Sequence, residues 1–349
     1  MKWYFTHPYK ESLSINFGKF TQVVGEDTQL KYYLWQILIW YFDGKKYSVE
    51  DLELFQQNEP QIISDGDVLK RTDYKLFYIS DIQNLVEQMI YKKGTVAFEY
   101  LKIKFNNLDI VDQIDCINDK LDYISSIMNT KLNIQIGDIV YHTESQYFNA
   151  EQLILKNFLP YFSIKEKNIS FEFIDNKIKF LIFLELLSEI LKQSSKKIIL
   201  MLKNIDDYLD YSSFIDCCNQ MKKLTEIFKN FHVIIFPSNE GYLYVNRENI
   251  EYINIISGLV THYYEFSFLY DRFIGHYPSN NIPTEEEFLK ILQKISSYLF
   301  NSELNHISLS TVDLASINIL NKLYHYDKSI NYYFQHVDPL LLNFLSNKD

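Results

Sequence analysis

Two short stretches of the chain carry residues that could bind a triphosphate and magnesium. Gly25 and Lys31 have the spacing of the first glycine and the lysine in a phosphate-binding loop, which normally reads Gly-x-x-x-x-Gly-Lys-Ser/Thr. Asp206 and Asp207 follow a continuous apolar run, and carboxylates in that position hold magnesium in phosphoryl-transfer enzymes. A site of this kind would use Lys31 for the outer phosphates and one of the aspartates for the metal ion.

The residues inside the loop argue against a working phosphate site. Leu30 stands where the second glycine belongs, and Tyr32 stands where the magnesium-binding hydroxyl belongs. Glu26 and Asp27 would place two negative charges beside the triphosphate, and like charges repel. We therefore interpret the stretch as a vestigial phosphate loop that leads into the first helix of an α/β core, and we expect no ATP binding.

The rest of the chain offers no other catalytic constellation. The eight histidines are scattered, and no His-Glu-x-x-His or Gly-x-Ser-x-Gly motif occurs. With only 9 glycines, the chain has little room for glycine-rich cofactor loops. We therefore expect a protein that is not an enzyme. The alternative that stays open is a divergent P-loop ATPase or kinase that uses Lys31 with Asp206 or Asp207.

The hydrophobic pattern around the loop predicts the elements that would position it. Alternating apolar residues over 13–17 and an apolar run over 20–24 predict two strands, joined as a hairpin by a two-residue turn. Apolar residues at helical spacing over 30–42 predict the helix that follows. Further strands are predicted at 75–79, 198–202 and 232–236, and the last two are continuous apolar runs of the kind found in parallel sheets.

The region between these strands is predicted to be helical. Residues 108–128 carry apolar side chains at alternating steps of four and three, which is a heptad seam, and residues 180–191 would be its packing partner. We expect a coiled-coil-like leg domain over 81–191, inserted into an α/β head domain built from 1–80 and 192–258. The seam consists of Ile110, Ile114, Ile117, Leu121, Ile124 and Met128.

The last part of the chain, residues 259–349, is predicted to be a C-terminal helical extension. Capping boxes begin helices near Thr284 and Ser310, and a short helix is expected from Asp338–Pro339. The predicted fold class is α/β, because the order of elements is that of an ATP-binding-cassette (ABC) type ATPase head with a degenerate phosphate loop. The glycine-rich signature loop of an intact ATPase is missing from the helical part.

Charge, cysteine use and hydropathy limit the class of protein. The formal net charge of −11 argues against strong general binding of nucleic acids, although residues 70–104 hold seven basic residues against four acidic ones. Residues 165–203 hold eight lysines against five acids. On sequence alone, solvated helix faces are the better explanation of both stretches. The three cysteines show no metal or disulfide spacing, and no apolar run could span a bilayer, so we expect a cytoplasmic protein without a membrane partner.

Several motifs in this order resemble one known family, the Csn-two proteins of type II-A CRISPR loci, which act in spacer acquisition. The resemblance covers about residues 1–260 and rests on residues 20–27 after a short connection, with the apolar helix behind them. It also rests on residues 196–204, which lead to Tyr208-Leu209, and on residues 233–237. The tail that follows looks like the larger branch of that family.

The resemblance implies a non-catalytic protein that holds double-stranded DNA, chiefly by its ends, in the central hole of a homotetrameric ring. It implies the CRISPR integrase complex and the type II effector nuclease as partners. In short members calcium steadies the ring at an acidic hinge, and the matching segment here, near 133–144, keeps only Asp138 and Glu144 as candidate ligands. A scaffold that assembles adaptation proteins without touching DNA is a second alternative.

An acidic protein can hold DNA only where its basic residues converge, because the attraction to phosphates is electrostatic. Two groups of lysines are candidates for this contact on the DNA-binding hypothesis. The first choice is Lys92, Lys93, Lys102 and Lys104, and the second choice is Lys177, Lys179, Lys196 and Lys197.

Overall fold

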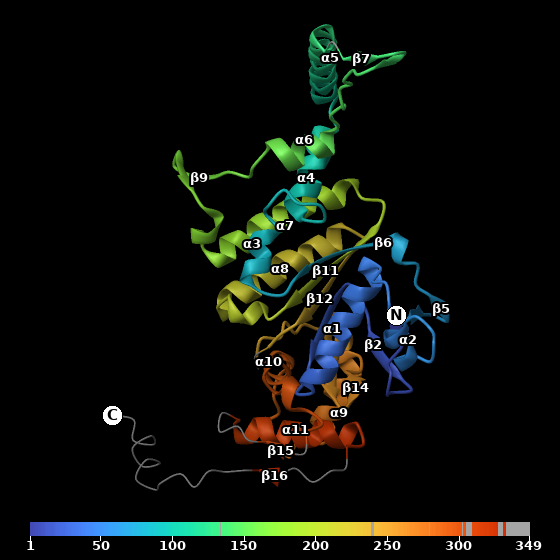
Figure 1. Cartoon of the computed structure of the whole chain (residues 1–349). Helices are drawn as coiled ribbons and strands as arrows, with labels where there is room; N and C mark the ends of the chain where they lie inside the picture. The colour runs from blue at the N-terminus through green and yellow to red at the C-terminus, as the bar shows by residue number, and fades with distance from the viewer. Residues whose placement is uncertain are drawn as a thin grey trace, which may run out of the picture. The chain divides into compact units, whose positions relative to one another are not determined.

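The structure is a computed structural model, and it describes residues 1–132, 134–238, 241–278, 280–301, 303–304, 309–326 and 331–332. The chain divides into two compact units (Figure 1). The first unit consists of Met1–Ser80 with Lys196–Asp349, and the second consists of Asp81–Ser195. The short helix expected from Asp338–Pro339 lies outside the described residues. Among the described residues, no helix is both long enough and apolar enough to cross a membrane.

A six-stranded sheet forms the centre of the first unit (Figure 1). Its order is β14 (Leu259–His262), β13 (Ile253–Ser257), β3 (Phe20–Val24), β12 (Phe231–Phe236), β11 (Lys197–Lys203) and β6 (Tyr74–Ile79). The pairs from β13 to β6 are parallel, and β14 pairs antiparallel with β13. The predicted α/β class with a parallel-containing sheet is confirmed. All residues of β12 are buried, as expected for a strand covered on both faces.

Helices pack on this sheet through apolar side chains. The helix α1 (Thr28–Asp43) buries Leu34, Trp35 and Leu38 against side chains of β11 and β12, including Met201 and Phe236. The helix α8 (Tyr211–Ile227) packs against β12 and buries both of its cysteines. These contacts place the segment between β3 and α1 at the ends of the parallel strands, which is where α/β sheets bind ligands.

The predicted hairpin between residues 13–17 and 20–24 is wrong. The strand β2 (Leu13–Asn16) belongs to a separate antiparallel sheet with β1 (Lys2–Phe5), β4 (Ile62–Ser64) and β5 (Asp67–Val68), near helix α2 (Val49–Leu54). The strand β3 has every residue buried, whereas β2 alternates between buried and partly exposed residues. The two burial patterns suit different sheets, and Gly18 and Lys19 connect one sheet to the other.

The C-terminal residues share a core with the sheet of the first unit. The helices here are α9 (Phe266–Gly275), α10 (Glu285–Ile295) and α11 (Thr311–Leu323), with a short parallel pair of β15 (Glu303–Leu304) and β16 (Asn331–Tyr332). Both expected capping boxes are present, at the starts of α10 and α11. Val24, Ile253 and Ile255 of the sheet belong to the same buried cluster as Phe288 and Leu320 of these helices. The extension therefore belongs to the same compact unit as the central sheet and does not form a separate unit.

The second unit is mainly helical. Its elements are α3 (Ile82–Glu87), α4 (Val96–Phe105), α5 (Leu108–Lys131), β7 (Gln135–Ile136), β8 (Ile139–Val140), α6 (Ala150–Asn157), β9 (Phe162–Ile164), β10 (Lys167–Ile169) and α7 (Asn176–Gln193). The helix α7 packs mainly against α3 and α4, so the expected pairing of 180–191 with the heptad seam of α5 is wrong. Ile114 is the buried residue of α5, while Ile117, Ile124 and Met128 of the seam are exposed.

Candidate nucleic-acid interface

The four lysines of the first predicted group lie in the second unit, and three of them are paired with carboxylates. Lys93 Nζ lies 3.3 Å from Glu151 Oε2, and Lys102 pairs with the other oxygen of Glu151. Lys104 Nζ lies 3.0 Å from Glu189 Oε2. Lys92 is exposed. Together with the two glutamates the group carries a net charge of 4 − 2 = +2, so it offers less attraction for phosphate than the lysines alone suggest.

The second predicted group is divided between the two units. Lys177 and Lys179 belong to the second unit, and Lys196 and Lys197 belong to the first. The assignment of Lys179 to a DNA-binding surface is wrong, because this residue is only 4% exposed and its Nζ donates to Asn176 Oδ1 at 3.0 Å. Lys177 and Lys196 each interact with another group of the protein.

A different set of lysines converges at one edge of the central sheet. Lys19, Lys197 and Lys229 stand at or just before the first residues of β3, β11 and β12, and we call them the strand-start lysines. The sheet order is β3-β12-β11 and all pairs are parallel, so these strand starts lie at the same edge. Burial is the main cause that lowers the pKa of Lys19, and the ammonium groups of Lys197 and Lys229 lower it further. The ammonium groups of Lys197 and Lys229 are therefore each close enough to repel that of Lys19.

The strand-start lysines differ in what their side chains contact. Lys19 is half-buried, and its Nζ donates to the backbone carbonyls of Lys229 and, at 3.5 Å, of Phe231. Lys197 Nζ lies 5.3 Å from the ring centre of Tyr74, and Lys197 and Lys229 are both exposed. Within the described part of the chain, no carboxylate pairs with any of the three. Two ammonium groups thus remain available to an anionic partner.

His232 of β12 lies directly behind this cluster. Its Nδ1 lies 3.1 Å from the carbonyl oxygen of Gly18, and Nδ1 must carry a hydrogen because a carbonyl only accepts. The ring stacks on Phe17 with 5.0 Å between ring centres. Burial lowers the pKa of His232 to about 4, and the ammonium groups of Lys19 and Lys197 act in the same direction. The imidazole is therefore neutral at physiological pH.

We expect His232 to make the fold sensitive to acid. The folded pKa of about 4 lies below the ordinary value of 6.5. As the pH falls from 6.5 to 4, the unfolded chain takes up a proton that the folded chain cannot, so the free energy of unfolding decreases by up to about 3 kcal/mol. Urea unfolding of the wild type and of His232→Asn at pH 7.5 and 4 measures this. The asparagine variant can still donate to Gly18 and should lose about 3 kcal/mol less than the wild type between these pH values. Equal losses would contradict the assignment.

The predicted phosphate loop is filled by the protein itself. Gly25 has φ +112°, and a Cβ built on it would lie 2.2 Å from the carbonyl oxygen of Ile256 in β13. The carboxylate of Asp27 caps α1, because its Oδ1 accepts from Leu30 N at 2.9 Å. A phosphate at a helix N-terminus binds the same backbone N–H groups. An acidic side chain of the chain therefore occupies the position that the triphosphate would need.

The other residues of the possible ATPase site are also engaged. Lys31 Nζ donates to the carbonyl oxygen of Pro237 at 3.1 Å, and burial lowers the pKa of Lys31. Asp206 Oδ1 accepts from Ser238 N at 2.9 Å. Ser238 Oγ lies 2.9 Å from Asp206 Oδ2 and 2.7 Å from Asp207 Oδ1. The structure brings these residues to one end of the sheet, where they hold Pro237 and Ser238 just after β12.

The two candidate calcium ligands lie in the segment after α5. Asp138 is in the turn between β7 and β8, and Glu144 is exposed with its Oε1 3.8 Å from His142 Nε2. In the part of the chain that is described, no group of three or more His, Cys, Asp or Glu side chains is placed to hold a metal ion. Calcium takes about six to eight oxygen ligands, so Asp138 and Glu144 would supply only part of the set that it requires.

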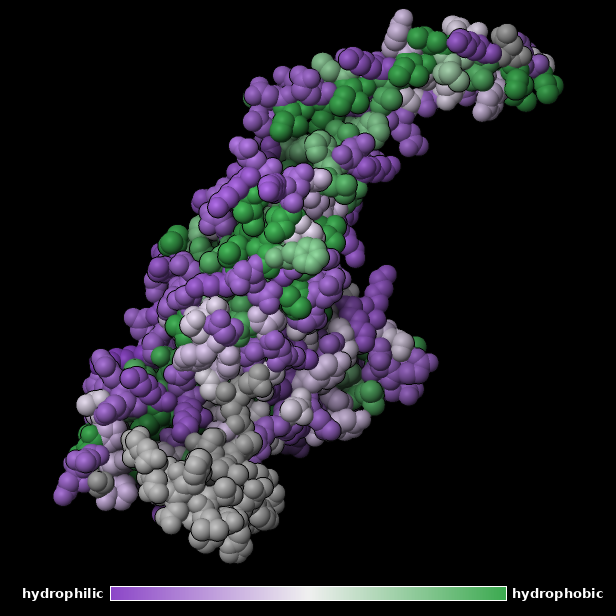
Figure 2. Space-filling view, turned by 90° about the vertical axis from the view of Figure 1, so that its left-hand side faces the viewer, coloured by the Kyte–Doolittle hydropathy of each residue, from purple (hydrophilic) through white to green (hydrophobic). Residues whose placement is uncertain are grey.

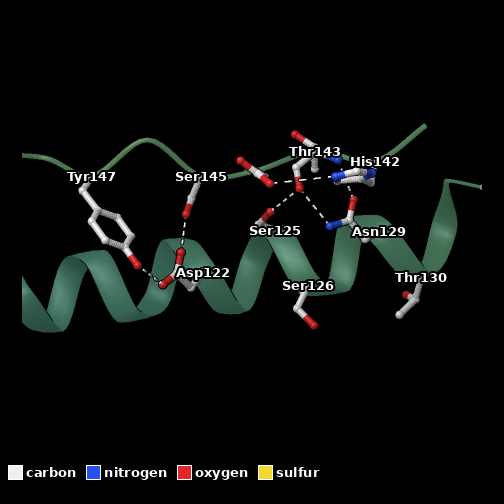
Figure 3. Close-up of a pocket in the computed structure, with 10 residues that line it drawn as sticks. Asp122, Ser125, Ser126, Asn129, Thr130, His142, Thr143, Ser145 and Tyr147 are labelled. Atoms are coloured by element: carbon white, nitrogen blue, oxygen red, sulfur yellow. Dashed lines mark hydrogen bonds and ion pairs between the residues drawn. The ribbon is translucent and has the colours of Figure 1, made fainter. Parts of the chain in front are cut away.

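Polar side chains near Glu144 bind one another. Figure 3 shows Ser145 and Tyr147 pointing toward Asp122 of α5, and the Tyr147 hydroxyl donates to Asp122 Oδ2 at 2.7 Å. Asn129 of α5 accepts from Thr143 N at 2.7 Å and donates to Thr143 O at 2.8 Å (Figure 3). These contacts fasten the extended segment along α5.

Two close matches among known proteins identify one family. The family model described as CRISPR-associated protein Csn2 subfamily St matches residues 5–346. The crystal structure of Stu0660 of Streptococcus thermophilus is 41% identical, with a TM-score of 0.90, and the match covers 99% of this chain and 100% of that chain. No curated protein matched the chain.

Two further solved structures are much less similar. The SMC head bound to the C-terminal winged-helix domain of ScpA is 12% identical with a TM-score of 0.44, over 75% of this chain and 96% of that one. The SMC head domain from Thermotoga maritima is 11% identical with a TM-score of 0.34, over 76% and 98%. Likenesses at this level carry no argument about function. The family model and the Stu0660 structure show that the chain belongs to the Csn2 family of CRISPR-associated proteins, subfamily St.

Proposed function

We propose that this protein binds double-stranded DNA through phosphate contacts, chiefly at DNA ends, and acts without catalysis in CRISPR spacer acquisition. The observation that carries the proposal is the cluster of strand-start lysines. Three ammonium groups lie at one edge of the sheet without a carboxylate partner among the described residues. Phosphate contacts of this kind give affinity without sequence preference.

The proposed active form is a homotetrameric ring in the cytoplasm, because a ring multiplies one small basic cluster fourfold around a central hole. Exposed apolar side chains support assembly, since a monomer seldom leaves many of them uncovered. Ile124 and Met128 of the α5 seam are 54% and 45% exposed. In the upper part of Figure 2, which contains α5, apolar side chains (green) lie at the surface among polar ones. The proposed partners are the CRISPR integrase complex and the type II effector nuclease.

We further propose that the first unit is an ABC-type ATPase head that has lost nucleotide binding, and that the second unit is its leg. The support is the order of elements, in which the parallel strand β3 leads through Gly25 into α1, while Asp27 and β13 fill the loop. For the head to act as an ATPase or kinase, Lys31 would have to leave the Pro237 carbonyl group, and the Asp206 carboxylate would have to leave Ser238.

We expect no measurable binding or hydrolysis of ATP. The Asp27 carboxylate repels the triphosphate at the N-terminus of α1, and Tyr32 replaces the serine or threonine whose hydroxyl would bind magnesium. Calorimetric titration with ATP and magnesium should give no heat of binding at concentrations of about 1 mM, the upper end of ordinary enzyme substrate affinities. Micromolar affinity that disappears in Lys31→Ala would contradict the proposal and favour a divergent ATPase.

The test of DNA binding uses one plasmid in two forms. We expect the plasmid cut once by a restriction enzyme to bind, and the covalently closed form to bind poorly, because a closed circle cannot thread a ring. Binding should weaken steeply with salt, as phosphate contacts do. Light scattering on the same sample should show about four chains of 41.8 kDa. Equal affinity for both forms would refute threading, a monomer at every concentration would refute the ring, and no binding to either form would favour the scaffold.

A further inference from the structure

The C-terminal helices form a pocket that lies apart from the strand-start lysines. It is a hollow of about 730 Å³ lined by residues of α9 and α11 and the turns beside them. Phe268 and Arg272 lie one turn apart on the same side of α9, and Tyr264 and His276 line the pocket from just before that helix and from its C-cap. Lys322 and His325 line the pocket from the end of α11. No Asp or Glu is among the described residues that line it.

The aromatic side chains of the pocket are held in place and are still exposed. Tyr264 stacks on Tyr324 with 4.8 Å between ring centres and 9° between planes, and Tyr264 N donates to the Tyr324 hydroxyl at 2.9 Å. Phe268 meets Tyr264 edge-on at 5.2 Å. Tyr264 is 41% exposed and Phe268 is 43% exposed. Aromatic rings that are held in place and still partly exposed suit a stacking ligand, since little freedom is lost when it binds.

The cationic side chains stand directly beside these rings. The Arg272 guanidinium lies 5.4 Å from the ring centre of Phe268. The Nδ1 of His276 lies 2.8 Å from the Arg272 carbonyl oxygen, so only its Nε2 can bind a ligand. Lys322 is exposed, and neither Lys322 nor Arg272 forms an ion pair within the described part of the chain. On a chain with a net charge of −11, a pocket that holds cations and no acid selects anions.

We propose that this pocket binds an unpaired nucleotide, as part of a single strand or as a free mononucleotide. The base packs against the Tyr264 and Phe268 rings, stacking on one and meeting the other edge-on, and the phosphate binds Arg272 and Lys322, because single-strand sites combine aromatic platforms with basic side chains. The volume lies within the range of about 300–1,000 Å³ that is usual for small-ligand pockets. The inference does not depend on the proposed duplex binding, which uses other residues.

The experiment measures fluorescence anisotropy of a labelled ten-nucleotide thymidine strand with the full-length protein. The double variant Arg272→Ala/Lys322→Ala should weaken binding at least tenfold, and Phe268→Ala should weaken it about tenfold, whereas Phe268→Tyr keeps a stacking ring and should bind within about twofold of wild type. The matched control is Lys290→Ala, which removes an exposed lysine from the neighbouring helix α10 outside the pocket. Thermal melts verify that each variant is folded.

Competition experiments separate the two sources of the nucleotide. Displacement of the labelled strand by thymidine monophosphate at concentrations similar to those of the unlabelled strand supports binding of free mononucleotide, and displacement by the strand alone supports binding of single strands. Strand binding that the double variant leaves unchanged would overturn the proposal, because the strand would then bind elsewhere. Absence of binding of both the strand and, by calorimetry, thymidine monophosphate would overturn it too, as would a ten-residue polyglutamate peptide that competes as well as the strand. Loss of duplex binding in strand-start lysine variants would leave this result unaffected.

Discussion

The double variant Lys197→Glu/Lys229→Glu is expected to lose at least 100-fold in affinity for linear duplex DNA at about 100 mM salt. Each substitution changes the charge by two units, so a ring of four chains changes by sixteen at one edge of its sheets, and affinity for phosphates depends on such charges through counterion release. Both side chains are exposed, so the fold should be preserved. Lys19 is left unchanged because its Nζ holds the carbonyl groups of Lys229 and Phe231. Gel shifts over a salt series give both the affinity and its salt dependence.

A matched control changes the same charge elsewhere on the first unit. Lys223→Glu/Lys290→Glu reverses two exposed lysines on α8 and α10, and we expect it to weaken binding by less than about fivefold, through long-range charge alone. If the two double variants bind DNA equally well, the strand-start lysines are not the DNA contact.

Charge reversal of the first predicted group of lysines tests the other candidate for the DNA contact. Reversal of Lys92, Lys93, Lys102 and Lys104 would also place new carboxylates beside Glu151 and Glu189, which now pair with three of these lysines. We expect a smaller loss of affinity than at the strand starts, since exposed ion pairs already compensate this group. A complete loss confined to this variant, with the tetramer intact, would move the DNA contact to the second unit.

The variant Gly25→Ala is expected to lower the free energy of unfolding by about 4 kcal/mol, from about 1–2 kcal/mol of backbone strain and about 1–3 kcal/mol of overpacking. The strain arises because φ is +112° at this position. The overpacking arises because the new methyl group would lie 2.2 Å from the carbonyl oxygen and 2.6 Å from the nitrogen of Ile256. Both atoms belong to backbone in β13, which cannot rotate away as a side chain could. Urea unfolding measures the change.

Gly66→Ala is the matched control for Gly25→Ala. Gly66 has φ +91° in the same unit, but nothing lies within 4 Å of a Cβ built on it. It should therefore cost only the strain of about 1–2 kcal/mol. The difference between the two variants isolates the contact with Ile256. If Gly25→Ala is no more destabilising than Gly66→Ala, the loop has room beside it, and the argument that β13 fills the phosphate site fails.

Local sequence determined the elements whose signals lie within a few residues of one another. The runs that became β11 and β12 are continuous and apolar, and both proved to be buried parallel strands. The capping boxes at Thr284 and Ser310 depend on a partner three residues away, and both formed as expected. The loss of the phosphate-binding motif could be recognised in the same way. Leu30 and Tyr32 stand at fixed motif positions that require glycine and serine or threonine.

Tertiary structure alone decided which of these elements meet. The strands β2 and β3 are neighbours in sequence and belong to different sheets, and the seam of α5 does not pair with α7. Lys19 and Lys229 each stand one or two residues before an apolar run, which is the only signal that the sequence gives for them. They meet Lys197 because β12 lies between β3 and β11, and that order follows from pairing over about two hundred residues of chain. Such pairings depend on the burial of many side chains at the same time. The spacing of residues within a short segment does not reveal which distant segments will be buried together.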